Sequence, residues 1–170
     1  MNDELKEELE KQGIKNKKRL GLGETIIYDN PKIYIRQSAK EIIASYEELP
    51  SAANNSLYVF SLRNSNTESK IFLKYLCGLL NSELITFYGQ QEKIIRYSKG
   101  KQPQIKTSDL YAIPIPTDKD IQDKISKIVD DIYLGNNIDE NKNKIDEIIY
   151  SYFELNKDEI CTIKEAIESF

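Results

Sequence analysis

The stretch from Thr67 to Gln91 constrains the fold of this chain most, because it is the longest apolar segment in the sequence. Its large apolar residues recur at spacings of three and four, which indicates a helix with a wide buried face. Asn66 or Thr67 can cap its start. Asn81 and Ser82 are predicted either to kink this helix or to divide it, because both side chains compete for backbone hydrogen bonds. Charged residues interrupt the apolar run, so it is not predicted to span a membrane.

Strand patterns lie on both sides of this helix. Residues 32–36 alternate, with their two isoleucines on the face expected to be buried. Residues 42–44 predict a short second strand, and residues 56–62, rich in aromatic and β-branched residues, predict a central strand. Residues 111–116 are closed by two prolines, a pattern that suits an edge strand.

Three helices are predicted after residue 116. Thr117 is expected to cap the first, at 117–134, and a second follows at 138–153. Asn156 with Glu159 makes a capping-box-like start for the last one. Because the joining loop is short, the first two helices should pair in antiparallel fashion. The isoleucines expected at this contact are Ile125, Ile128, Ile132, Ile145 and Ile149.

These patterns predict an α+β fold: a small twisted, mainly antiparallel sheet packed on a long buried helix and followed by a C-terminal helical tail. The expected organisation has three parts. Residues 1–27 form an N-terminal helix and linker, with a polar amphipathic helix at 3–19. Residues 28–116 form the α+β domain, and residues 117–170 form the helical tail.

Composition excludes several kinds of site. The chain has no histidine, which removes Ser-His-Asp and Cys-His triads and imidazole metal sites. The net charge of −4 is unevenly spread. Residues 29–116 carry eleven basic and eight acidic groups, whereas residues 117–170 carry seven basic and fourteen acidic groups. The middle of the chain is therefore the part suited to meet a polyanion.

The N-terminus also limits where the protein is expected. It reads MNDELKEELEKQ, a charged helix pattern rather than a signal peptide. The two cysteines lie far apart in sequence, as is usual for unpaired thiols in a reducing compartment. We therefore expect a cytoplasmic protein without membrane association.

Two short motifs begin like catalytic motifs and are then incomplete. Residues 29–32 read DNPK, whereas amino-methyltransferases have a second proline and an aromatic residue after DNP. Glu68 and Lys70 form the ExK half-motif of many nucleases, but no aspartate on a preceding strand completes a metal site. We interpret them as an acidic first turn and a solvated lysine. No catalytic or metal-binding residue is therefore predicted in this chain.

The segment 90–106 has the composition of a nucleic-acid contact. It is rich in basic residues and contains glutamines and a tyrosine, while Gly100 and Pro103 prevent a continuous helix or strand. Lysine and arginine can bind phosphates, arginine can also read guanine, and glutamine can read adenine. The alternative is a surface loop whose charges serve solubility. The candidate DNA-binding residues are Lys93, Arg96, Tyr97, Lys99, Lys101, Gln102, Gln104 and Lys106, with Arg36 and Arg63 at strand ends that could share this face.

The order of these segments resembles a known family. KIYIRQSAKEIIASYE, NNSLYVFSL, LKYLCGLLNSELITFY and QIKTSDLYAIPIP follow one another over residues 28–116. They are similar to the TaqI-like C-terminal specificity domain, the target-recognition domain of adenine-specific DNA methyltransferases and fused restriction–modification enzymes, including type IIG enzymes. The resemblance implies a partner methyltransferase domain or subunit, and in some cases an endonuclease. S-adenosylmethionine, and magnesium where there is a nuclease, would then belong to that parent enzyme and not to this chain.

Three functional hypotheses follow. The leading one is a specificity domain that recognises a double-stranded DNA sequence for a restriction–modification enzyme and has no catalytic residues of its own. The alternative is a protein-interaction module whose acidic helices at 117–170 dock a partner subunit. The third is a metal-dependent nuclease built on Glu68 and Lys70.

Overall fold

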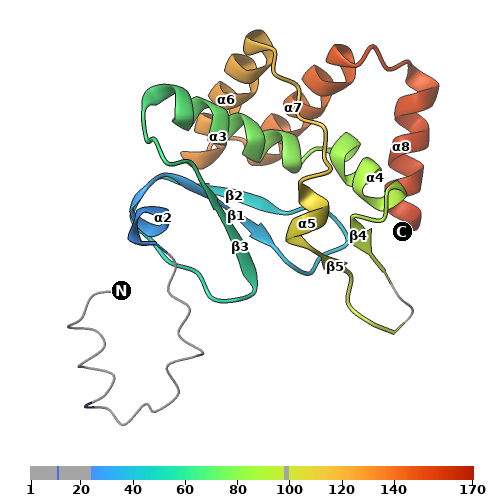
Figure 1. The fold of residues 1–170 in the computed structure, drawn as a ribbon. Coiled ribbons are helices and arrows are strands. Elements are labelled where there is room, and N and C mark those ends of the chain that lie inside the picture. Colours follow the sequence, from blue (N-terminus) through green and yellow to red (C-terminus); the bar gives the residue numbers. More distant parts are fainter. Residues whose placement is uncertain (1–10, 12–23, 98–99) are drawn as a thin grey trace.

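The structure is a computed structural model that describes residue 11, residues 24–97 and residues 100–170. Apart from residue 11, the helix predicted at 3–19 lies outside the described residues. The described part is α+β, with a small antiparallel sheet and several helices, so the predicted fold class is confirmed (Figure 1). The sheet lies against one face of a layer of helices, and the last three helices complete that layer.

The main sheet has three antiparallel strands in the order β2-β1-β3. They are β1 (Lys32–Arg36), β2 (Ala44–Glu47) and β3 (Leu57–Ser61), and a short helix, α2 (Thr25–Asp29), precedes them. β1 is therefore the central strand, and the prediction that residues 56–62 form it was wrong. β2 begins two residues later than predicted, because Ile42 is buried in the loop before it.

Lys32 departs from the simple alternation expected for β1. Its side chain is fully buried, and its Nζ donates to the carbonyl of Leu49 at 2.9 Å and to Oγ of Ser51 at 3.4 Å. Desolvation by burial lowers the pKa of Lys32, which the nearby carboxylate of Glu47 partly offsets. The lysine thus joins the start of β1 to the 49–51 loop.

The apolar stretch 67–91 is divided into two helices, which was one of the two alternatives predicted for Asn81 and Ser82. α3 (Thr67–Leu80) and α4 (Glu83–Gln91) are separate helices. The side chain of Asn66 accepts from the amide of Ser69 at the start of α3. Ser82 caps α4, and Asn81 instead bonds to the backbone of Ala44 in β2, accepting from its N–H at 3.0 Å and donating to its carbonyl at 2.8 Å. Polar side chains that bond backbone groups therefore end one helix and begin the next.

Residues 111–116 do not form the predicted edge strand. After α5 (Thr107–Leu110) the chain runs to the next helix without strand pairing. Ile113 is buried in the core, and the carbonyl of Pro116 accepts from the hydroxyl of Tyr75 at 2.8 Å. The prolines cannot donate to a ladder, so side-chain burial and this one hydrogen bond fix the segment instead.

The three tail helices are α6 (Lys119–Tyr133), α7 (Ile138–Tyr152) and α8 (Lys157–Ser169). Asp118, not Thr117, caps α6, because its carboxylate accepts from two amides of the first turn. The capping box of Asn156 and Glu159 is present. α6 and α7 pack against each other, and α6 also lies along α3.

One hydrophobic core runs from the sheet through α3 to α7. α3 and α6 approach closely at Gly78, where an added Cβ would lie 2.5 Å from Cγ2 of Ile125 in α6. Only glycine lets the two helices come this near.

The predicted boundary at residue 116, between the α+β domain and the helical tail, remains a prediction. Residues of α6 belong to the same hydrophobic core as the sheet and α3. None of the described helices is long and apolar enough to cross a bilayer.

Candidate nucleic-acid interface

The predicted loop contains a short two-stranded hairpin. β4 (Ile95–Arg96) pairs with β5 (Gln104–Ile105) in antiparallel register, with Ile95 opposite Ile105 and Arg96 opposite Gln104. Successive strand residues point to opposite faces. The two isoleucines are buried, whereas Arg96 and Gln104 are exposed side by side on the other face. The hairpin therefore presents one cation and one amide on a single exposed surface.

Contacts from the main sheet hold β5 in place. The amide of Ile105 donates to the carbonyl of Gln37 at 2.9 Å, and the hydroxyl of Tyr58 donates to the carbonyl of Ile105 at 3.0 Å. The hydroxyl of Ser38 lies 2.7 Å from the carbonyl of Pro103, to which it donates. The hairpin is thus attached beside the end of β1, which is the end that carries Arg36.

This attachment brings four of the predicted residues together. Arg36, Gln102, Gln104 and Lys106 line one open pocket of about 380 Å³. All four are exposed, and Oε1 of Gln102 accepts from the hydroxyl of Ser38 at 3.2 Å. Two cations and two amides, from the end of β1 and from residues 102–106, therefore line the same hollow, a combination that can bind phosphate and base edges at once.

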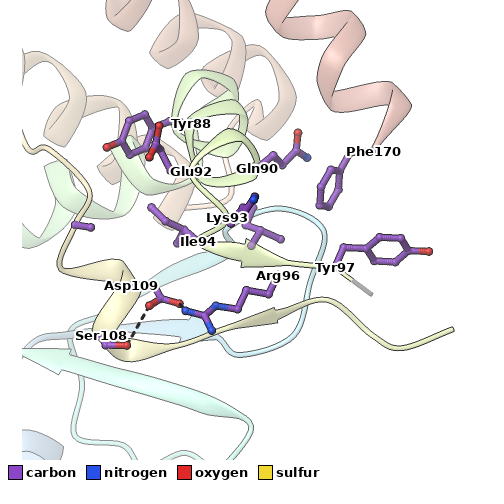
Figure 2. A pocket seen from close by; sticks show the side chains of 12 residues that line it. Tyr88, Gln90, Glu92, Lys93, Ile94, Arg96, Tyr97, Ser108, Asp109 and Phe170 are labelled. Carbon is purple, nitrogen blue, oxygen red and sulfur yellow. Dashed lines mark hydrogen bonds and ion pairs between the residues drawn. The ribbon is translucent and has the colours of Figure 1, made fainter. Parts of the chain in front are cut away.

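A second, larger pocket of about 720 Å³ also lies beside the hairpin (Figure 2). Three more predicted residues line it: Lys93, Arg96 and Tyr97. The ring of Tyr97 lies 5.8 Å from that of Phe170, between centroids. Arg96 reaches across this pocket toward α5, where its Nη2 lies 2.8 Å from Oδ2 of Asp109.

Arg63 does not share this face. β1 and β3 are antiparallel, with Arg36 opposite Leu57 and Lys32 opposite Ser61. Arg63 lies two residues beyond Ser61, at the end of the sheet away from Arg36. The four steps of β1 from Arg36 to Lys32 alone span roughly 13 Å at about 3.3 Å per residue. The expectation that the two arginines could share one face was wrong, because it was made without knowing the strand pairing.

Two of the predicted lysines remain to be placed. Lys99 lies outside the described residues. Lys101 is exposed and follows Gly100, whose φ of +80° is a left-handed conformation that favours glycine. The hairpin turn thus places at least one lysine at its tip.

Sequence reasoning missed three residues that organise this interface: Ser38, Tyr58 and Asp109. Each bonds to a residue far along the chain, and Ser38 and Pro103 are 65 positions apart. None belongs to a local motif, so only the docking of the hairpin reveals them.

The nuclease half-motif does not form a centre. Glu68 lies 3.8 Å from the ammonium of Lys119, whereas Lys70 pairs with Glu48 at 2.5 Å. The hydrogen bond from Lys70 is the main cause that lowers the pKa of Glu48. Within residues 24–97 and 100–170, no group of three or more acidic or cysteine side chains is placed to hold a metal ion. The two residues of the motif therefore serve separate ion pairs.

Comparison with known families decides what this scaffold is. A sequence profile described as the TaqI-like C-terminal specificity domain matches residues 7–115, more than half of the chain. The chain belongs to this family. The matched range includes the sheet, α3, α4 and the whole β4–β5 hairpin, and it ends before α6. A search of curated proteins finds no match. Specificity domains of this family are parts of restriction–modification enzymes, which agrees with a surface suited to DNA.

Proposed function

We propose that this chain recognises a specific sequence in double-stranded DNA for a restriction–modification enzyme, and that the β4–β5 hairpin is the element that reads it. The observation that carries the proposal is the cross-strand pair of Arg96 and Gln104, both exposed on one face of a two-stranded ribbon. The major groove of B-DNA admits such a ribbon.

The two side chains match different bases. Arginine forms two hydrogen bonds with O6 and N7 of guanine, and glutamine forms two with N6 and N7 of adenine. Opposite residues of an antiparallel pair have Cβ atoms about 5 Å apart, and successive base pairs are separated by about 3.4 Å. Arg96 and Gln104 are therefore spaced to contact neighbouring base pairs.

Exposed cations around the ribbon suit a positioning role. Arg36 and Lys106 face the smaller pocket beside Gln104, and Lys101 follows the hairpin turn. Phosphate contacts fix the register of a protein on the duplex without carrying sequence information. Together with Arg96 and Gln104 these cations supply both kinds of contact that specific binding needs.

Methyl transfer and cleavage are assigned to a partner domain or subunit in this proposal. That partner, a methyltransferase with or without an endonuclease as in type IIG enzymes, would hold S-adenosylmethionine and magnesium. Recognition alone needs no activated nucleophile, and family membership supports a non-catalytic role in a cytoplasmic enzyme.

The test is a selection from duplexes with a randomised central stretch, using the full chain at low salt because a detached module binds weakly. The wild-type protein should enrich a short motif that contains guanine or adenine at neighbouring positions. Arg96→Ala and Gln104→Ala should each remove one of these preferences, at a cost of about 1–3 kcal/mol on the selected site.

Arg63→Ala is the matched control, because it removes an exposed arginine from the opposite end of the sheet. It should leave the motif unchanged. The proposal is wrong if the wild-type protein enriches no motif, or if the double alanine variant of Arg96 and Gln104 selects the same motif as the wild type.

A second candidate function has an observation of its own. The turn between α6 and α7 exposes Tyr133, Leu134 and Ile138, with 72 % of Leu134 accessible. The surrounding helices are acidic, which suits docking of a partner protein rather than of DNA. Leu134→Glu should then weaken association with a parent methyltransferase domain in analytical ultracentrifugation while leaving DNA selection intact. Equal association of both proteins would exclude this turn as the docking point.

A further inference from the structure

We infer that Asp109 is a positioning residue that holds the guanidinium of Arg96 in the orientation for reading guanine. This inference rests on the proposed function of the hairpin, and it concerns a residue that lies outside the hairpin itself.

Arg96 and Asp109 form an ion pair between the hairpin and α5. Nη2 of Arg96 lies 2.8 Å from Oδ2 of Asp109, and the hydroxyl of Ser108 donates to Oδ1 of the same carboxylate at 3.1 Å (Figure 2). The Asp109 side chain is 18 % exposed, whereas 49 % of Arg96 is accessible. The carboxylate is therefore sheltered and the arginine still faces solvent.

The carboxylate belongs to a firmly attached element. Asp109 lies in α5, and Leu110 next to it packs against the hydrophobic core. β5 enters α5 directly, because Lys106 is the residue before its first turn. Asp109 therefore lies only four residues beyond the end of β5, beside a residue packed on the core, which suits it to position the guanidinium.

A fixed guanidinium has two advantages for base recognition. A free arginine loses side-chain rotamer entropy when it binds, and a side chain that is already ordered loses less. The carboxylate uses only part of the five-donor fork, so donors remain for two acceptors of one base. The carboxylate of Asp109 also offsets the positive charge of Arg96. The arginine is then attracted less to phosphates, which occur at every position, while it can still bond to guanine.

A purely structural role predicts different behaviour. If the ion pair only joined the hairpin to α5, its loss would lower thermal stability and weaken binding to every duplex together. A positioning role predicts loss of preference at one base-pair position, unchanged preference at the others, and equal or stronger binding to random DNA because a negative charge has been removed.

The experiment compares the full-length wild-type chain with Asp109→Asn in the same selection from randomised duplexes. Glu140→Gln is the matched control, because it breaks an exposed ion pair with Lys144 on α7 and removes the same charge. The guanine preference assigned to Arg96 should fall from roughly 5- to 150-fold to about threefold or less in Asp109→Asn. Glu140→Gln should keep the wild-type preference at every position.

A second variant keeps the test decisive if Asp109→Asn unfolds. Ser108→Ala removes only the exposed hydroxyl that orients the carboxylate, and it should reduce the same guanine preference by a smaller factor. The inference is wrong if a folded Asp109→Asn protein keeps the full guanine preference. If Asp109→Asn does not fold, the same result for Ser108→Ala overturns it. In both cases the hairpin proposal still stands. Failure of the wild-type protein to select any motif overturns both.

Discussion

The contact of α3 with α6 has no space for an added methyl group. A Cβ at Gly78 would lie 2.5 Å from Cγ2 of Ile125 and 3.0 Å from Cγ2 of Val129. At the β4–β5 hairpin, two of the four paired side chains face solvent. The hairpin is attached to the main sheet through hydrogen bonds to Gln37, Ser38 and Tyr58. The first region tolerates little change in volume. The second is attached by two buried isoleucines and by polar contacts at its base, and its other face is free to vary.

The difference separates the residues that determine stability from those that we propose read DNA. Arg96 and Gln104 contribute no side chain to the core, and Gly78 and Ile125 lie in the helical layer away from the hairpin. Changes in the hairpin should therefore alter sequence preference at nearly constant stability, whereas changes between α3 and α6 should do the reverse. Four substitutions test this separation.

Gly78→Val should have the largest effect. Its branched side chain has no space between Ile125 and Val129, so the helices must separate and the core loses packing. We expect the free energy of unfolding to fall by about 3 kcal/mol or more in urea denaturation. Truncation of the opposing residue, in Gly78→Val/Ile125→Ala, should cost less than the two single changes added together. Strict additivity would show that the clash is relieved elsewhere.

Asp146→Asn should change the pH dependence of the helical region. Burial, with the nearby carboxylate of Glu83 adding to it, raises the pKa of Asp146 from 3.8 to about 6, although the backbone amide of Glu83 and the ammonium of Lys164 oppose the rise. Between these two pKa values, Asp146 is therefore largely protonated in the folded state and largely ionised in the unfolded state. The free energy of unfolding should therefore rise as the pH falls from 7 to 5, because proton uptake by Asp146 favours the folded state.

The expected gain for the wild type between pH 7 and pH 5 is about 1 kcal/mol from this group, measured by urea denaturation at both values. Asp146→Asn should flatten the change and be more stable than the wild type at pH 7, because an amide still accepts the hydrogen bond from Glu83. Glu147→Gln, an exposed change on the same helix, should keep the wild-type dependence. A steep pH dependence that persists in Asp146→Asn would assign it to another group.

Tyr58→Phe tests how the hairpin is attached. The substitution removes the donor to the carbonyl of Ile105, at a cost of about 1 kcal/mol. Amide hydrogen exchange at Ile95 and Ile105 should become faster. Tyr34→Phe is the control, because it removes a hydroxyl that bonds Ser51 at 2.8 Å in the same sheet but away from the hairpin. Equal exchange of the hairpin amides in both variants would show that Tyr58 is not one of its anchors.

Lys101→Gln should have the smallest effect on stability, within about 0.5 kcal/mol of the wild type, because the side chain is exposed. Its effect should appear in DNA binding. If Lys101 contacts a phosphate, binding to all duplexes should weaken alike and the salt dependence should lose roughly one unit of slope. Lys127→Gln, which removes an exposed lysine from α6, should retain the wild-type slope. A changed base preference in Lys101→Gln would instead make it a reading residue.

Local chemistry explains what could be predicted from the sequence. The caps at Asn66, Ser82 and Asn156 depend on groups within four residues of one another, so the sequence contains their cause. The basic segment was also recognised from composition, and seven of its predicted residues line the two pockets beside the hairpin or, like Lys101, lie at its turn.

Long-range pairing explains what could not be predicted. Whether residues 56–62 form a central or an edge strand depends on which strands β1 joins, and hydrophobic pattern alone does not decide this. The position of Arg63 relative to Arg36 depends on the same pairing. Lys32 is buried because Leu49 and Ser51 supply acceptors, and the pair of Arg96 with Asp109 exists only once the hairpin lies beside α5.

The side-chain amide of Asn81 is a site where hydrolysis would change the structure. It meets the backbone of Ala44 as another strand would, with one donor and one acceptor, and it does so on β2, one of the two outer strands of the sheet. An uncovered outer strand invites other chains to add to it. Hydrolysis of this one amide to a carboxylate would set an oxygen against the carbonyl of Ala44 and release the backbone it covers. Conversion of Asn81 to aspartate should therefore weaken the contact between the end of α3 and β2 and expose this strand edge.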